Sequence, residues 1–162
     1  MQVRGFSPIA LPDAEILILG SMPGAASLEA GQYYAHPRNA FWPIMADLFG
    51  AGAELPYEMR LARLKERRVA VWDVLQLCIR EGSLDADIRA EVPNDFATFF
   101  AAHPHVRRIG LNGGKAAVSF RKYAAVHMPA GAEAVILPST SPAHAARSLE
   151  NKLHLWRTAL LG

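Results

Sequence analysis

The chain has 162 residues, of which 51% are hydrophobic and 20% charged, and its formal net charge is +2. This composition supports one folded domain and argues against disorder. The single cysteine excludes an internal disulfide and any zinc or iron–sulfur centre built on several thiolates. No apolar run approaches the roughly 20 residues of a membrane span, and no signal-peptide core is present. We therefore expect one domain over residues 1–162, cytoplasmic and without membrane contact.

Short apolar runs alternate along the chain with patterns of helical period. The expected strands are residues 15–19, 69–72, 107–111 and 134–137, and the expected helices are 41–49, 57–68, 95–102, 114–123 and 148–161. Such alternation is typical of a parallel sheet covered on both faces. The sequence therefore predicts an α/β fold, a three-layer α/β/α sandwich with a central four-stranded parallel sheet. Residues 73–94 fit neither pattern and are expected to be mainly loop.

Small and polar residues follow each expected strand. GSMPG begins at Gly20 after the first strand, Asp73 follows the second, NGGK begins at Asn112 after the third, and PSTSP begins at Pro138 after the fourth. Ligands of open α/β sheets bind outside the carboxyl ends of the strands. We expect these four segments to meet at one rim and to form the functional site.

The segment after the first strand has the richest chemistry. GSMPG is neither a P-loop nor a dinucleotide fingerprint, and by itself it is an ordinary turn. The loop after it also holds aromatic, basic and amide side chains, which favours a site over a plain connection. These side chains are Tyr33, Tyr34, His36, Arg38 and Asn39. Glycines for close backbone approach, flat rings for stacking and one amide together suggest a nucleobase site.

The other two loops allow more than one interpretation. The glycines after Asn112 could bind a phosphate on backbone N–H groups, the Asn112 amide could read a base edge, or the segment could simply turn into a helix. The hydroxyls of STSP suit phosphate contacts or a helix cap. His36 and His144 fit neither a Ser-His-Asp triad nor a metal-ligand pattern, so we expect no such hydrolase, no metal and no cofactor.

Taken together, the motifs resemble the uracil-DNA glycosylase superfamily, and within it the hypoxanthine-DNA glycosylase branch. They span nearly all of the chain and are specific as an ordered set. The matching motifs are GSMPG (20–24), YAHPRN (34–39) with FW (41–42), WDV (72–74), NGGK (112–115) and LPSTSP (137–142).

The resemblance implies a monofunctional DNA glycosylase of base excision repair. It would flip a deaminated base, hypoxanthine first, out of double-stranded DNA and hydrolyse its bond to the sugar. Gly20, Ser21 and Met22 would form the loop facing water and sugar, Tyr34 would stack on the base, and Asn112 would hydrogen-bond its edge. Mismatch-type relatives carry a catalytic Asn in this first loop, at the position of Met22. In the branch that this chain resembles, Asn39 has that duty.

The resemblance also assigns the last loop to DNA. Its polar residues would grip the phosphates, and His144 is favoured over Pro142 and Ala143 to fill the gap left by the flipped base. The residues implied for phosphate binding are Ser139, Thr140, Ser141 and Pro142. Possible auxiliary residues are His36, Asp73 and Lys115. Asp73 could act as a general base, although a structural hydrogen bond is the favoured interpretation.

Three alternatives remain open on sequence grounds. The chain could remove uracil or mismatched thymine, could bind damaged DNA without catalysis, or could act on free nucleotides. Basic residues within 60–68 and 147–152 favour a polymer over a free nucleotide. No lysine suggests a Schiff base, so strand cleavage is not expected. A monomer is the simplest expectation.

Overall fold

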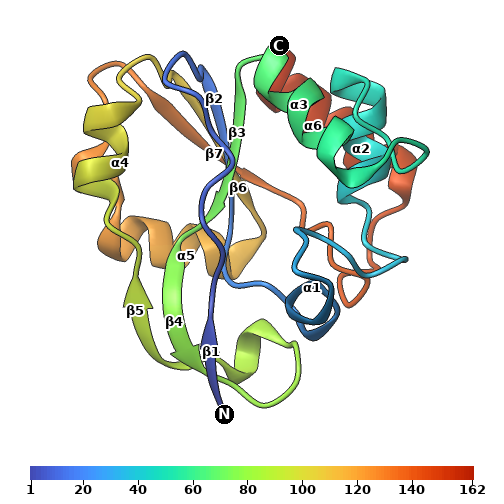
Figure 1. Cartoon of the computed structure of the whole chain (residues 1–162), viewed down its shortest axis with the longest axis vertical. Helices are drawn as coiled ribbons and strands as arrows, with labels where there is room; N and C mark the ends of the chain where they lie inside the picture. Colours follow the sequence, from blue (N-terminus) through green and yellow to red (C-terminus); the bar gives the residue numbers. More distant parts are fainter.

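Four parallel strands form the centre of the computed structural model, which describes all 162 residues. Their order in the sheet is β3-β2-β6-β7 (Figure 1). The strands are β2 (Ile16–Gly20), β3 (Val69–Asp73), β6 (Arg108–Asn112) and β7 (Glu133–Leu137). Every residue of β2 and β3 is buried, as expected for strands covered on both faces. The predicted α/β architecture is confirmed.

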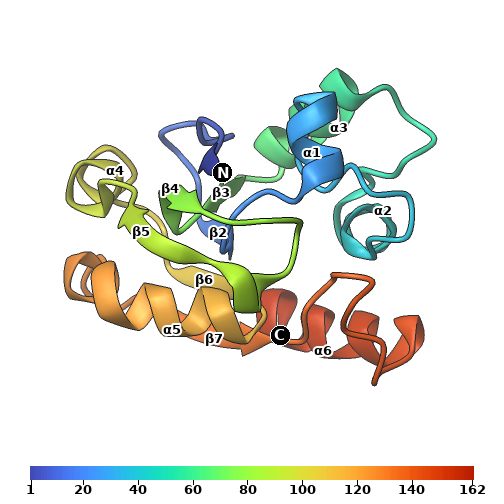
Figure 2. The same ribbon diagram turned by 90° about the horizontal axis from the view of Figure 1, so that it is seen from below.

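Helices cover both faces of this sheet (Figures 1 and 2). On one face lie α2 (Phe41–Phe49), α3 (Tyr57–Glu66) and α6 (Leu149–Leu161), and on the other lie α4 (Phe96–Ala102) and α5 (Gly114–Tyr123). The alternation of β2 divides the core accordingly: Ile16 and Ile18 pack with the first group, whereas Leu17 and Leu19 pack with the second. No helix combines the length and apolar character needed to cross a membrane.

The helix boundaries follow local signals. α2 and α5 have the predicted bounds, and α4 and α6 begin one residue late because the preceding Asp95 and Ser148 are N-caps that accept from Thr98 N and Asn151 N. α3 ends at Glu66, and two residues later Arg68 takes a left-handed φ of 59° that a helix cannot contain. One six-residue helix, α1 (Ala25–Ala30), lies in the segment expected to be loop.

The expectation that residues 73–94 are mainly loop is wrong. They contain β4 (Leu75–Ile79), the short 3-10 helix η1 (Asp85–Asp87) and β5 (Arg89–Pro93), and these strands join β1 (Gln2–Arg4) in an antiparallel sheet of order β1-β4-β5. The pattern was hidden because the β4–β5 register shifts twice, which breaks the alternation. This sheet lies at the bottom of Figure 1 and carries the loop 80–88 towards the carboxyl ends of the parallel strands. A second short 3-10 helix, η2 (Ala125–His127), follows α5.

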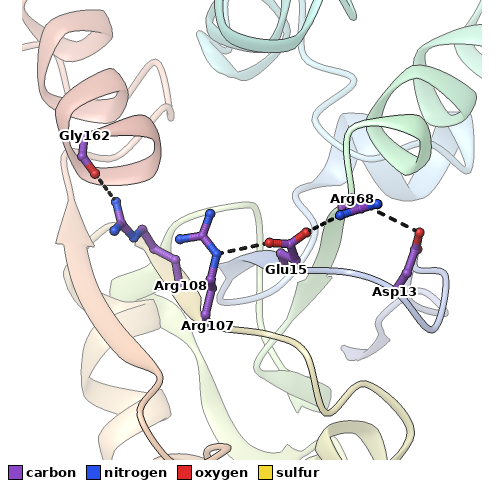
Figure 3. Close-up of polar contacts among 6 residues, drawn as sticks. All are labelled: Asp13, Glu15, Arg68, Arg107, Arg108 and Gly162. Carbon is purple, nitrogen blue, oxygen red and sulfur yellow. Dashed lines mark hydrogen bonds and ion pairs between the residues drawn. The ribbon is translucent and has the colours of Figure 1, made fainter.

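Charged residues join the amino ends of the parallel strands (Figure 3). Glu15 pairs with Arg68 and Arg107, at 2.8 and 3.1 Å, and Arg68 also approaches Asp13. Nη1 of Arg108 donates to the carbonyl oxygen of Gly162 at 2.8 Å. Hydrogen bonds from Arg68 and Arg107 hold the pKa of the Glu15 carboxyl below its ordinary value. These arginines therefore lie at the end of the sheet opposite the predicted site.

Candidate active site

A cavity of about 730 Å³ opens at the carboxyl ends of the parallel strands. This volume lies within the range of small-ligand pockets, roughly 300–1,000 Å³. The lining comes from stretches within residues 20–27, 33–39, 83–86, 112–114 and 139–144, together with Asp73. Segments far apart in the chain thus meet where the strand ends predict a site.

The structure brings all but one of the predicted site residues to this cavity. Those that line it are Gly20, Ser21, Met22, Tyr34, His36, Asn39, Asp73, Asn112, Ser139, Thr140, Ser141, Pro142 and His144. The exception is Lys115, which is absent from the lining. Its Nζ lies 2.6 Å from Oε2 of Glu91, and Oε1 of the same carboxylate accepts from the hydroxyl of Tyr123. Lys115 therefore connects α5 to β5.

Tyr34 forms an aromatic wall of the cavity. Its ring is stacked on that of Phe41, with 3.9 Å between centroids and 16° between planes, so one face is covered. Phe41 is fully buried at the start of α2 and gives this ring a rigid support. The φ of Tyr34 is 54°, a left-handed value that a bulky residue keeps only where its surroundings fix it. Burial raises the pKa of its hydroxyl, which stays neutral.

The Asn112 amide is the centre of a buried hydrogen-bond network. Its Nδ2 donates to Oγ1 of Thr140 at 3.0 Å and to the hydroxyl of Tyr34 at 3.3 Å, and its Oδ1 accepts from the backbone N of Thr140 at 3.0 Å. Both amide hydrogens are therefore in use, and one lone pair of Oδ1 remains. Asn112 joins β6 to the loop after β7 and to Tyr34.

Asn39 lies on the same cavity and is held at the start of α2. Its Oδ1 accepts from the backbone N of Phe41 at 2.9 Å, and its own N donates to the carbonyl of His36 at 2.9 Å. The N of the next residue, Ala40, donates to the carbonyl of Thr140, also at 2.9 Å. These contacts fix the amide but leave its Nδ2 and the second lone pair of Oδ1 free to bind a small polar molecule.

The loop after β7 presents hydroxyls at the rim. Oγ of Ser139 accepts from Ser141 N at 3.1 Å, and Oγ of Ser141 accepts from Ala143 N at 3.2 Å, so both hydroxyl protons remain available. Nζ of Lys152 is buried beneath the loop and donates to the carbonyl of His144 at 2.7 Å. Burial lowers the pKa of this lysine. The His144 side chain is exposed at the rim.

One wall of the cavity was not predicted from the sequence. It consists of residues 83–86, from the segment expected to be mainly loop. Oγ of Ser83 accepts from Ala25 N at 2.8 Å, and Oγ of Ser21 donates to Oδ1 of Asp85 at 2.6 Å. Buried Arg80 adds a hydrogen bond to the carbonyl of Pro23 at 2.6 Å. In the sequence, the one local sign of this wall is Arg80, a charged residue directly after the partly apolar run Leu75–Ile79.

Gly20 leaves space for two functional groups. It is paired in register with Asp73 at the ends of β2 and β3. A Cβ on Gly20 would lie 2.5 Å from Oδ1 of Asp73 and 2.9 Å from the hydroxyl of Tyr34. Both distances are shorter than van der Waals contact. Only glycine therefore lets the carboxyl and the phenol occupy this position together.

We expect Gly20→Ala to lower the free energy of unfolding by about 1–3 kcal/mol, the usual effect of overpacking a well-packed site. Gly24→Ala is the matched control, because its Cβ would meet Ser83 at 3.5 Å, an ordinary contact. Urea unfolding of both variants measures the difference. Equal stabilities for the two variants would show that Asp73 and Tyr34 move aside freely.

Comparison with known proteins gives a consistent family. The model of the family described as Uracil DNA glycosylase superfamily matches residues 8–160. A hypoxanthine DNA glycosylase of Methanosarcina barkeri is 35% identical over 160 residues, 98% of each chain. A hypoxanthine DNA glycosylase of Methanosarcina acetivorans is 38% identical over 142 residues, 87% of each chain.

A solved structure agrees. The solution NMR structure of a proposed uracil DNA glycosylase from Methanosarcina acetivorans superposes with a TM-score of 0.80 at 34% identity, covering 98% of this chain and 99% of that one. The predicted enzyme class, a DNA glycosylase, is confirmed by these matches. The chain belongs to the uracil DNA glycosylase superfamily.

Proposed function

We propose that this chain is a monofunctional glycosylase that removes hypoxanthine from double-stranded DNA in base excision repair, acting as a single-domain monomer in the cytoplasm. The observation that carries the proposal is the cavity in which Tyr34, Asn39 and Asn112 meet. Its size suits one everted base. Support for the substrate comes from the two relatives, at 35% and 38% identity, that are named hypoxanthine DNA glycosylase.

The target base has to leave the duplex before it can enter this cavity. Extrusion costs a few kcal/mol, and less for a base that pairs poorly. Hypoxanthine opposite thymine or cytosine pairs less well than the normal partners do. Part of the selectivity therefore arises before the base meets the protein. Inside, the free face of Tyr34 stacks on the ring, and the remaining lone pair of Asn112 Oδ1 accepts from a base N–H.

Asn39 positions the attacking water. Its open Oδ1 lone pair can accept a hydrogen bond from a water beneath the sugar carbon, while the contacts to Phe41 and His36 hold the amide still. An amide is a poor base and orients water without deprotonating it. This suits a dissociative reaction, in which water adds to a sugar cation that is already largely formed.

The loop after β7 binds the DNA backbone. The hydroxyls of Ser139 and Ser141, together with the rigid Pro142, contact phosphates on either side of the flipped nucleotide. The predicted phosphate contact of Thr140 is not part of the proposal, because its hydroxyl is buried against Asn112. The exposed His144 fills the space that the base leaves. Lys152 keeps this loop in place through the carbonyl of His144.

No lysine is in a position to form a Schiff base with the sugar. None lines the cavity: Lys115 is paired with Glu91, and Lys152 donates to a backbone carbonyl. The reaction therefore ends at base release and leaves the strand intact.

We expect the purified chain to release hypoxanthine from a labelled duplex that contains one deoxyinosine, with the strand breaking only after alkali treatment. Parallel duplexes carrying deoxyuridine, deoxyxanthosine or a G·T mismatch measure the base preference. Faster release from uracil or thymine would assign the chain to the mismatch-type activity. Tight binding with no release from any duplex would indicate a non-catalytic damage-binding protein, and breakage before alkali would contradict the monofunctional assignment.

A further inference from the structure

A buried carboxyl without a partner lies at the floor of the cavity. Asp73 ends β3, is 4% exposed and lines the cavity beside Gly20. Its Oδ2 is buried and has no hydrogen-bond partner. Arg80 and Ser119 carry the other two buried polar atoms without a partner, and neither residue lines the cavity. Buried polar groups in native proteins are nearly always hydrogen-bonded, so an unpaired carboxyl oxygen on a residue that lines a ligand cavity points to a bound group.

The surroundings of Asp73 favour its neutral form. The structure contains no ion pair to this carboxyl, because the guanidinium of Arg80 is directed to the carbonyls of Pro23 and Gly82. The other ionisable groups near it are Asp85, which accepts from Ser21, and the hydroxyls of Tyr33 and Tyr34. Burial, reinforced by Asp85 and opposed by Arg80, raises the pKa of Asp73 to about 7.

Two polar side chains at this end of the cavity, Asn112 and Ser21, have no hydrogen left to donate to a base. Both N–H groups of Asn112 are used by Thr140 and Tyr34, and the hydroxyl of Ser21 donates to Asp85. A deaminated base presents a carbonyl oxygen beside a ring N–H. The oxygen needs a donor, whereas the ring N–H can be satisfied by the remaining lone pair of Asn112. A neutral carboxyl supplies such a donor, next to the hydroxyl of Tyr34, which accepts from Asn112 and keeps its own proton.

We propose that Asp73, in its neutral form, donates a hydrogen bond to the carbonyl oxygen of the extruded base and stabilises that base as it leaves. This inference rests on the proposed glycosylase function.

When the bond between sugar and base breaks, its electron pair stays on the base, and the carbonyl oxygen takes part of the negative charge. Asp73 keeps its proton and shares it in a bond that strengthens as the charge grows. Water adds its oxygen to the sugar cation, and its released proton balances the departing base. A carboxylic acid kept neutral in an apolar site can donate to an oxyanion in this way.

The test is the pH dependence of base release from a deoxyinosine duplex under single-turnover conditions, between pH 5 and 9. The wild-type rate should be constant in acid and fall about tenfold for each unit above a pH near 7, because ionised Asp73 cannot donate. Asp73→Asn should stay within about tenfold of the wild-type rate at low pH and lose the fall, since an amide donates at every pH. Asp73→Ala should lose about 10²-fold or more at all pH values, the typical effect of removing one such donor.

Two controls separate the possible explanations. His36 also lines the cavity, and His36→Gln should keep the fall above pH 7 whatever its rate. Circular dichroism and urea unfolding check that each variant is folded. The pH profile of the wild-type rate does not depend on any variant.

A wild-type rate that rises through pH 7, with an inactive Asp73→Asn, would make Asp73 an ionised base and overturn the inference. A flat wild-type profile would also overturn it. Absence of base release from every duplex at every pH would instead contradict the proposed function.

Discussion

Replacing Asn39 with alanine is expected to lower the single-turnover rate of base release by about 10²–10³-fold, the range seen when one well-placed polar group of an active site is removed. The reason is that Asn112, the other amide that lines the cavity, has both N–H groups in use and its remaining lone pair assigned to the base. Binding to a deoxyinosine duplex should change little, because Asn39 acts on water rather than on the base. Rate and affinity are measured on the same labelled duplex.

The variant also removes a capping contact, and this effect has to be separated. Oδ1 of Asn39 accepts from Phe41 N, so Asn39→Ala should cost about 1 kcal/mol of stability. Asn39→Asp keeps both the cap and an acceptor for water, and should retain far more activity than alanine does. Pro37→Ala, at an exposed neighbour that does not line the cavity, is the control for nonspecific effects on the loop. Full activity in Asn39→Ala would refute the assignment of the water-positioning role.

The parallel sheet and its helices were predictable because they depend on local patterns. β2 is a short apolar run, and α2 and α5 have clear helical periodicity, so their positions agree with the prediction within about one residue. The antiparallel sheet was not predictable. β1 pairs with β4 across more than seventy positions of sequence, and only three residues of β1 take part. Such pairing is decided by tertiary packing and leaves almost no local trace.

The site shows the same division. Strand ends predict its place, since Gly20, Asp73 and Asn112 all lie at the carboxyl ends of parallel strands. Sequence could not predict the direction of a side chain: Lys115 follows Asn112 closely but turns on α5 towards Glu91. Nor could it show that Asp73 lacks a structural partner, because the absence of a hydrogen bond depends on every neighbouring element. The hydrogen-bond partners of Asn112 were hidden for the same reason.

Replacing Asn112 with alanine is expected to destabilise the protein by about 1–3 kcal/mol, because the backbone N of Thr140 is left buried without a partner. Base release should fall by about tenfold or more, since each 1.4 kcal/mol of stabilisation lost from the transition state lowers the rate tenfold. The loss of base release could have two origins. The loop after β7 is no longer held by the Asn112 amide, or the base lacks its contact to that amide. The network favours the loop as the main origin, because three of the amide's hydrogen bonds go to Thr140 and Tyr34.

A double-mutant cycle with Thr140→Val separates these origins. Thr140→Val removes the acceptor of one Asn112 N–H and leaves the second lone pair of Oδ1 open to a base, while Oδ1 still accepts from the backbone N of residue 140. If Asn112 acts mainly by holding the loop, the two substitutions affect the same connection, and the double variant should be little worse than Asn112→Ala alone. If Asn112 acts mainly on the base, the two increases in activation free energy should add. Tyr34→Phe, which removes only the 3.3 Å contact, gives the third comparison and should have the smallest effect of the three single substitutions. Additive losses would show that the contact from Asn112 to the base, beside that of Asp73, matters more for the rate than the hold of Asn112 on the loop.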